Sequence, residues 1–447
     1  MMRAATAHLL KSSPVTRLEG RARLPGDKAI SHRALMLGAL AVGETTIQGA
    51  REAPDTVATA AALRQLGATL EHPGGGEWRI HGVGVGGLRE PDDIVHLGDS
   101  GTSARILIGL LASHDFTSFV TGGPYLHRRP MGRVIEPLSR MGARFVARSG
   151  GRLPMAITGP RTVLPIEHRM SARSAQVKSA ILMAALNAPG ESTVIEPEAT
   201  RDHTELLMED FGATLRREQL EGGALSVTVV GQPELRGRAL VVPGDPSVGA
   251  FAAVAAALVR GSDVTVMNVG VNPLRVGLFE TLREMGADLT FANRRSMGGE
   301  PVADIRVRGG ELRGVDVPAS RAPTMIDEYP VLAAAAAGAV GTTRMAGLAD
   351  LRGEDGDKLA AIAAGLAANG VKSDLGPDFL HVHGMDGGVP GGGMVDTGSD
   401  YSVAMAFLVL GMAAKAPVTI DDAKPIDTSF PGFVTMMNVL GARIGDV

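Results

Sequence analysis

The sequence predicts an α/β protein of two domains, built from six copies of one unit whose first helix is buried and whose strands lie outside it. Three observations lead to this prediction. One pattern recurs six times, its first helix is apolar nearly all round, and its second helix ends at a glycine. A chain of 447 residues also exceeds what one ordinary core supports, which favours two domains.

The repeated pattern opens with a polar or glycine-containing turn. A run of small apolar residues follows, and a short break leads into a strand rich in Thr, Val and Ile. The starts lie about 75 residues apart, a longer period than that of the usual solenoid repeats. The six copies begin at Gly26, Gly98, Arg173, Gly244, Ile326 and Ser399.

The second half of each copy is an amphipathic segment that ends in glycine and leads into another strand. A glycine just past a helix supplies a left-handed C-cap. Each copy therefore reads strand, helix, strand, helix, strand. The six glycines are Gly67, Gly142, Gly212, Gly286, Gly370 and Gly441.

The two helices of a copy differ in polarity. The second carries residues such as Arg64, Arg140 and Arg283, which predicts partial exposure. The first is apolar nearly all round, which is typical of a buried helix. Six buried helices inside their sheets would be an unusual architecture. The pattern alone leaves open an ordinary doubly wound sheet with helices on its faces.

The composition argues against several classes of protein. A net charge of −4 without a Lys or Arg stripe gives no footprint for nucleic acid. The absence of cysteine excludes disulfides and thiolate zinc sites. No apolar run reaches the roughly 18 residues of a membrane helix, and the start of the chain lacks the apolar core of a signal peptide. We therefore expect a cytoplasmic protein without a membrane partner.

Polar and charged residues gather where the buried helices are expected to start. A helix N-terminus directs free N–H groups and a partial positive charge outward, which favours anions. Lys, Arg, Ser and Gln beside it predict a phosphate or carboxylate site. The residues are Asp27, Lys28, Ser31, His32 and Arg33; Asp99, Ser100, Thr102, Ser103 and Arg105; Arg173, Ser174, Gln176 and Lys178; and Asp327 and Glu328.

Simple N-capping is the competing interpretation of these helix starts. It is the favoured one for Asp99, Ser100 and Asp245. It explains Lys28, Arg33 and Arg105 less well, because cations oppose the helix dipole at that end, and we predict that these three bind a ligand. The histidines show no metal-ligand spacing, so His32 and His203 are expected to be structural, or to support site residues from behind, rather than to bind a metal.

Seven segments stand in order along nearly the whole chain. They are LPGDKAISHRALMLGAL, RRPMGRVIEPL, SAQVKSAILMAALN, EPEATRDHTELL, VPGDPS, RAPTMIDEYPVLAAAAA and TSFPGF. Together they resemble the enolpyruvyl transferase family, and within it the 5-enolpyruvylshikimate-3-phosphate synthases, especially the bacterial class tolerant of glyphosate.

This resemblance implies a two-domain inside-out α/β barrel, with three βαβαββ repeats and buried helices in each domain. One domain would hold residues 26–240 on the shikimate-phosphate side. The other would combine residues 1–25 with 241–447 on the phosphoenolpyruvate side. The ligand would lie in the cleft between the domains, which closes on binding.

The resemblance also implies a reaction of the aromatic amino-acid (chorismate) pathway. A carboxyvinyl group moves from phosphoenolpyruvate to the 5-hydroxyl of shikimate 3-phosphate, and phosphate leaves. The family needs no metal or organic cofactor, and we expect a monomer. Two anionic substrates require cations and aimed N–H donors, and the hydroxyl requires a general acid–base group.

Site residues follow from the same resemblance, position by position. Asp327 would be the acid–base carboxylate, and Lys28 would touch both substrates. The ring and its phosphate would be held by Arg33, Ser174, Gln176 and Arg201. The phosphoenolpyruvate pocket would include Gly101 and Arg129. Asp355 and Lys358 would complete the catalytic and substrate-binding set.

Some positions depart from the family pattern. Its Lys-Ser pair is here Lys28-Ala29. Its Lys-Glu-Ser-Asp-Arg run is here Glu354-Asp355-Gly356-Asp357-Lys358, so a substrate-binding lysine is an acid and an arginine has lost its bidentate fork. Its Asp-His-Arg is here Asp400-Tyr401-Ser402, which removes another arginine. The changes cluster on the phosphoenolpyruvate side.

Three hypotheses follow from these departures. The first is a working carboxyvinyl transferase with a rebuilt phosphoenolpyruvate pocket. The second is a diverged homologue that binds a phosphorylated shikimate-like ring and catalyses another reaction, such as elimination, without phosphoenolpyruvate. The third is a non-catalytic binding protein. The sister enzyme acting on UDP-N-acetylglucosamine is disfavoured, because the ring motifs resemble the shikimate branch and no cysteine exists.

Overall fold

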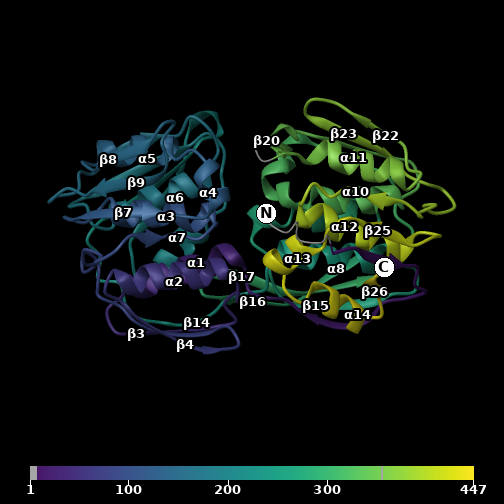
Figure 1. The fold of residues 1–447 in the computed structure, drawn as a ribbon, viewed down its shortest axis with the longest axis horizontal. Coiled ribbons are helices and arrows are strands. Elements are labelled where there is room, and N and C mark those ends of the chain that lie inside the picture. The colour runs from purple at the N-terminus through teal and green to yellow at the C-terminus, as the bar shows by residue number, and fades with distance from the viewer. Residues whose placement is uncertain (1–7, 354–355) are drawn as a thin grey trace, which may run out of the picture. The chain divides into compact units, whose positions relative to one another are not determined.

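The structure is a computed structural model that describes residues 8–353 and 356–447, and these residues form two compact units (Figure 1). Unit A comprises Gly26–Pro243 and Ser296–Glu300. Unit B comprises residues 8–25, Gly244–Arg295 and Pro301–Val447, less the two that are not described.

The described part of each unit contains three four-stranded sheets with a common topology. In every sheet an edge strand runs parallel to its neighbour, and that neighbour is antiparallel to the next strand. The same topology recurs in both units because the same order of strands and helices is repeated six times along the chain.

In spatial order, the sheets of unit A are β14 (Ala239–Val241), β3 (Glu44–Gln48), β5 (Glu77–His81) and β4 (Thr69–Gly74); β6 (Val95–His96), β7 (Thr117–Thr121), β9 (Arg152–Thr158) and β8 (Arg144–Arg148); and β10 (Glu167–Arg169), β11 (Glu191–Glu196), β13 (Leu225–Val230) and β12 (Leu215–Gln219).

Those of unit B are β16 (Asp288–Met297), β17 (Glu300–Arg308), β15 (Asp263–Gly270) and β2 (Glu19–Arg23); β18 (Asp316–Val317), β19 (Thr342–Ala346), β23 (Phe379–His383) and β22 (Ser373–Leu375); and β24 (Met394–Val395), β25 (Val418–Ile420), β1 (Leu10–Ser13) and β26 (Arg443–Asp446).

The first helix of each repeat is buried, as its apolar sequence predicts. In α12, for example, 11 of 13 residues are buried. Within each unit the strands lie outside these helices, so the doubly wound alternative is wrong (Figure 1). The buried helices are α1 (Lys28–Leu40), α3 (Gly101–Leu111) and α6 (Ala175–Ala185) in unit A, and α8 (Pro246–Leu258), α10 (Tyr329–Ala337) and α12 (Tyr401–Ala413) in unit B.

The second helices are partly exposed and end where the glycines predict. All six glycines adopt positive φ, between 78° and 106°, which a residue with a side chain rarely adopts. The helices are α2 (Pro54–Gln65), α5 (Gly132–Arg140), α7 (His203–Asp210), α9 (Gly277–Glu284), α11 (Lys358–Ala368) and α14 (Phe433–Val439).

Short elements complete the described chain. They are α4 (Pro124–Arg128), α13 (Lys424–Ser429), the strand pair β20 (Arg352–Gly353) and β21 (Gly356–Asp357), and the 3-10 turns η1 (Glu221–Gly223), η2 (Pro273–Arg275), η3 (Ala319–Thr324), η4 (Ile326–Glu328) and η5 (Ala349–Leu351). Among the described residues, no helix combines the length and the apolarity that a membrane crossing demands.

Candidate functional site

The starts of the three buried helices in unit A are fixed by side-chain caps. Asp27 accepts a hydrogen bond from the backbone N–H of Ile30 at 3.0 Å, and Ser174 accepts one from Val177 at 3.3 Å. Ser100 caps α3 in the same way. The capping interpretation is therefore confirmed for Ser100, and also for Asp245, which caps α8 in unit B.

The prediction that Asp99 caps α3 is wrong. Its carboxylate instead accepts the backbone N–H of Leu126, in the first turn of α4, at 3.1 Å. The neighbouring Ser100 has taken the cap of α3 because its side chain reaches the N–H of Ser103. Asp99 thus ties the short helix α4 to the start of α3.

Lys28 is the first residue of α1, and its ammonium group donates a hydrogen bond to the carboxylate of Asp55. The two side chains are 39% and 21% exposed, so the pair meets solvent. Asp55 lies in the first turn of α2, a position where acidic residues are common in any helix. Nothing in the sequence marks it as the partner of Lys28, and sequence reasoning missed it.

His32 is buried one turn into α1 and stays neutral. One ring nitrogen, Nδ1, lies 2.9 Å from the hydroxyl of Thr59. Burial, and then the positive charge of Lys28, lower the pKa of His32 from 6.5 to about 3, although Asp55 acts in the opposite direction. Protonation would add a cation beside Lys28 and Arg33, so the neutral ring suits either packing or support of its neighbours.

We predict that His32 does not titrate between pH 8 and pH 5. A histidine whose folded-state pKa is depressed contributes stability above its unfolded pKa, near 6.5, and loses that contribution as the pH falls toward the folded value of about 3. The imidazole NMR shifts of His32, assigned by comparison with His32→Asn, should stay constant over this range. A titration midpoint above pH 5 would contradict the assigned environment.

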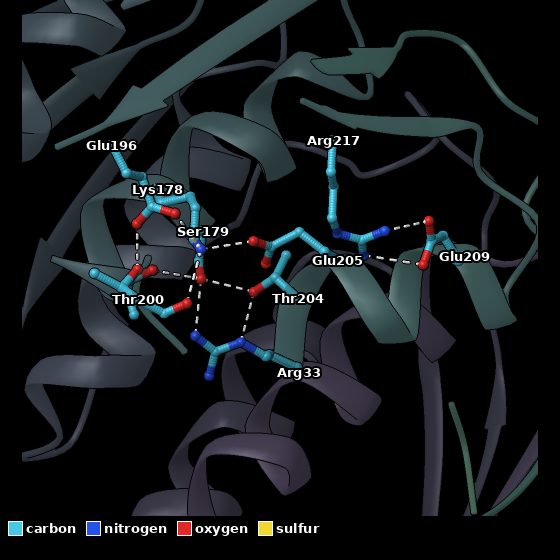
Figure 2. A network of polar contacts seen from close by, with 10 residues as sticks. Arg33, Lys178, Ser179, Glu196, Thr200, Thr204, Glu205, Glu209 and Arg217 are labelled. Atoms are coloured by element: carbon cyan, nitrogen blue, oxygen red, sulfur yellow. Dashed lines mark hydrogen bonds and ion pairs between the residues drawn. The ribbon is translucent and has the colours of Figure 1, made fainter. Parts of the chain in front are cut away.

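Arg33, on the same helix, lies inside unit A with 2% of its surface exposed. Its Nε donates to Thr204 Oγ1 at 2.6 Å, one Nη donates to Ser179 Oγ at 2.8 Å, and the other donates to the Ala29 carbonyl at 2.9 Å (Figure 2). Burial lowers the pKa of Arg33 to about 10, while Glu205 acts to raise it. The guanidinium is therefore charged at neutral pH and ties α1 to α6 and α7.

Gly101 lies where two arginine side chains converge at the start of α3. A Cβ atom at this position would sit 3.0 Å from Arg105 Nη1 and 3.1 Å from Arg129 Nη1. Arg105 donates to the side-chain oxygen of Gln176, whose amide in turn donates to Thr102 at 2.9 Å. The structure thus brings the predicted residues Gly101, Arg129 and Gln176 together around two cations.

Arg129 is oriented by an aromatic ring. Its guanidinium carbon lies 4.4 Å from the centroid of the Tyr125 ring, and one of its nitrogens donates to the Tyr125 hydroxyl. The ring face and the hydroxyl of Tyr125 together fix the direction of this guanidinium. Sequence reasoning missed Tyr125, although an aromatic residue four positions before an arginine is a usable signal within a helix.

The remaining predicted residues of unit A lie at the entry to α6 and α7. Ser174 caps α6, and Arg201 immediately precedes Asp202, the first residue before α7. The charge of Arg201 contributes to lowering the pKa of Arg33, which places the two cations within electrostatic range. Of the seven predicted site residues of unit A, five lie at or next to helix starts, while Arg33 lies inside α1 and Arg129 directly follows α4.

In unit B, Asp327 lies in the 3-10 turn η4, directly before α10. Its neighbour Glu328 is buried and accepts a hydrogen bond from Ser247. The next residue, Tyr329, is also buried, and burial raises its pKa to about 12. Asp327 itself is only partly buried, so it is the carboxylate of this turn that a ligand can reach.

Lys358 and Ser402, two of the positions that depart from the family pattern, both contact Asp400 in unit B. Lys358 Nζ lies 2.8 Å from a carboxylate oxygen of Asp400, which caps α12 through the N–H of Ser402 at 2.8 Å. Burial alone would raise the pKa of Asp400, but Lys358 and the hydrogen bond from Ser402 lower it below its usual value. Asp355 and Glu354 lie outside the described residues.

The second of these histidines, His203, lies in a buried pair. His203, the first residue of α7, is 2% exposed, and its Nδ1 lies 2.5 Å from a carboxylate oxygen of the buried Glu300. Within the described ranges, no group of three or more His, Asp or Glu side chains could hold a metal ion.

Comparison with known proteins covers almost the whole chain. The family model described as "EPSP synthase (3-phosphoshikimate 1-carboxyvinyltransferase)" matches residues 12–437. A 3-phosphoshikimate 1-carboxyvinyltransferase of Paramagnetospirillum magneticum is 58% identical over 97% of this chain and 98% of its own. One of Rhodospirillum rubrum is 56% identical, over 97% of each chain.

Solved structures match as well. EPSP synthase from Acinetobacter baumannii superimposes with a TM-score of 0.90, at 39% identity, over 98% of this chain and 100% of that one. The enolpyruvyl transferase NikO from Streptomyces tendae matches with a TM-score of 0.76 at 18% identity, over 99% of each chain, which is a likeness of fold alone.

Proposed function

This chain belongs to the EPSP synthase (3-phosphoshikimate 1-carboxyvinyltransferase) family, and from that membership we propose that it transfers the carboxyvinyl group of phosphoenolpyruvate to shikimate 3-phosphate. The observation that carries the proposal is the placement of cations in unit A: Lys28 stands at the capped start of α1, and Arg105 and Arg129 converge on Gly101 at the capped start of α3. Helix N-termini with cations are suited to phosphate and carboxylate groups.

The proposed chemistry divides the residues by role. The ring substrate is held by Arg33 of α1, and its phosphate by the starts of α6 and α7, through Ser174, Gln176 and Arg201. Gly101 admits the guanidinium groups of Arg105 and Arg129, and these two cations face the second anion. Asp327 of unit B takes the proton from the attacking hydroxyl, and Lys28 contacts both substrates.

The proposal includes a rebuilt anion site in unit B. Lys358 keeps a positive charge, which Asp400 orients at 2.8 Å, while Ser402 serves the cap of α12 and offers no charge. Asp355 remains a proposed proton-transfer residue. As the sequence predicts, the protein acts as a cytoplasmic monomer on two small anions.

Phosphate release tests this function. The purified protein is incubated with shikimate 3-phosphate alone, phosphoenolpyruvate alone, and both. Release only in the complete mixture is the expected result. Release from shikimate 3-phosphate alone would instead identify the diverged homologue that catalyses elimination, a hypothesis that none of the similar proteins supports. Binding without release would identify a binding protein.

Removing the charge at position 358 should weaken phosphoenolpyruvate binding selectively. Loss of one charged hydrogen-bond partner costs about 1.5–3 kcal/mol, so we expect Lys358→Ala to raise KM for phosphoenolpyruvate at least about tenfold. The affinity for shikimate 3-phosphate, measured by calorimetry, should not change. Lys358→Arg is the matched control and should keep or improve the KM. An unaltered KM in the alanine variant would remove Lys358 from the site.

A further inference from the structure

A buried polar network lies behind the predicted ring-phosphate site of unit A. Lys178 Nζ contacts Glu196 at 2.8 Å and Glu205 at 2.6 Å, and it donates to the Thr200 carbonyl at 3.2 Å (Figure 2). The side chains of the lysine and the two glutamates are at most 1% exposed. Glu196 ends β11, and Glu205 lies in α7, so the lysine ties α6 to both.

This ion cluster is continuous with the contacts of Arg33. Ser179 follows Lys178 on α6, and Thr204 precedes Glu205 on α7. The hydroxyls of Ser179 and Thr204 lie 2.6 Å apart, and each accepts an N–H of Arg33 (Figure 2). Neighbouring residues on two helices thus build the ion cluster on one side and the arginine cradle on the other.

The network is balanced in charge but costly to bury. Lys178 and Arg33 offset Glu196 and Glu205, so the four groups carry no net charge. Burial alone would lower the pKa of Lys178, but Glu205 and Glu196 raise it above its usual value, and the lysine stays protonated. Because apolar residues of similar volume would stabilise a core equally well or better, stability alone does not account for four buried charges.

Arg33 retains donors for a ligand. A guanidinium has five N–H groups, and three of them bind Thr204, Ser179 and the Ala29 carbonyl. Within residues 8–353 and 356–447 the other two, one on each terminal nitrogen, make no hydrogen bond. The cradle therefore fixes the plane of the guanidinium and leaves one N–H on each Nη.

We propose that Thr204 and Ser179 are positioning residues for substrate binding, which hold the guanidinium plane of Arg33 from behind while the Lys178–Glu196–Glu205 cluster fixes α6 and α7 in register. This inference rests on the proposed function, in which Arg33 binds the ring substrate. Neither hydroxyl touches the substrate. Both act through Arg33, and their removal leaves its charge in place but lets the guanidinium rotate.

Thr204→Val tests the inference, because valine keeps the shape of threonine and replaces only its hydroxyl with a methyl group. We expect KM for shikimate 3-phosphate to rise at least tenfold, with kcat within twofold of the unmodified enzyme. Thr204→Ser restores the acceptor and should restore KM. Thr193→Val is the matched control: it removes a hydroxyl pair with Thr228 elsewhere in unit A, and it should leave KM unchanged.

A double-mutant cycle with Arg33→Ala separates positioning from general damage. If Thr204 acts through Arg33, the double variant binds shikimate 3-phosphate no more weakly than Arg33→Ala alone. Additive losses would overturn the inference, as would an unchanged KM in Thr204→Val or a failure of the serine variant to restore it. Should Thr204→Val not fold, Ser179→Ala is measured against the same criteria.

A readout independent of catalysis distinguishes this inference from the proposed function. The Arg33 Nε–H proton, bonded to Thr204 in the interior, should exchange slowly with solvent in the unmodified protein and rapidly in Thr204→Val. If the unmodified protein shows no transferase activity, the proposed function fails whatever this proton does. If activity is present but the proton exchanges equally in both proteins, the cradle is refuted by itself.

Discussion

Asp327→Asn is expected to lower kcat by about 10²- to 10⁴-fold, the range typical of a lost general acid–base group. Asparagine keeps the size of aspartate and can still hydrogen-bond a ring hydroxyl, but it cannot accept the proton that the attacking oxygen must lose. The affinity for shikimate 3-phosphate should therefore change little. Steady-state phosphate release at saturating concentrations of both substrates measures the effect.

The position of Asp327 makes this variant a clean test. The side chain is partly exposed in the turn that leads into α10, while the buried acid beside it, Glu328, is already bound to Ser247. Asp316→Asn is the matched control, since Asp316 is an exposed residue of unit B paired with Arg344 at 3.1 Å. A fall in kcat of less than about tenfold in Asp327→Asn would exclude the acid–base role.

Lys178→Met is expected to destabilise unit A by about 3–5 kcal/mol, because removal of one partner leaves uncompensated buried charge. Glu196 and Glu205 would face each other with at most 1% exposure and no cation between them. Tryptophan fluorescence reports unit A specifically, because the single tryptophan of the chain, Trp78, is buried in β5. Urea unfolding followed at this residue measures the loss.

The loss of unfolding free energy in Lys178→Met should depend on pH. Burial raises the pKa of Glu196 above its usual value, and Lys178 partly opposes that rise. Without the lysine the folded-state pKa rises further. A carboxyl with a raised folded-state pKa is most favourable below its unfolded pKa, and its contribution is lost as the pH rises through the folded value. The variant should therefore be closer to the unmodified protein at pH 5 than at pH 8.

Arg236→Met is the control for this comparison. Arg236 is a cation of unit A with 78% of its side chain exposed, 3.4 Å from Glu234, and an exposed ion pair contributes about 0–1 kcal/mol. A loss in Lys178→Met no larger than in this control would show that the buried cluster contributes nothing to unit A. If the stability loss of Lys178→Met instead grew toward pH 5, the charge assigned to Glu196 in this cluster would be wrong.

The fold could be predicted from the sequence because its signals are local and repeated. Each apolar run gives a buried helix, and each of the six glycines gives a left-handed helix end. The helix caps were predictable for the same reason at Ser100 and Asp245, whose side chains bind N–H groups two or three residues ahead. At Asp99 the prediction failed because the carboxylate acts across 27 residues, on α4.

The candidate site was predictable only in part. The types of its residues can be read from short segments, but their hydrogen-bond and ion-pair partners lie far along the chain. Cations at helix starts can be read from the sequence. The partner of Lys28 cannot, since Asp55 belongs to another helix, and neither can the cradle of Arg33, whose members Ser179 and Thr204 stand 146 and 171 residues away. In the sequence, Glu196 and Glu205 cannot be told from ordinary surface acids, and only the structure shows that they are buried.

The most direct test of the central claim is a crystal structure of the protein with shikimate 3-phosphate. The account predicts the ring phosphate within hydrogen-bonding distance of Ser174, Gln176 and Arg201, at the starts of α6 and α7. A substrate phosphate bound away from these helix starts, with the three side chains untouched, would contradict it.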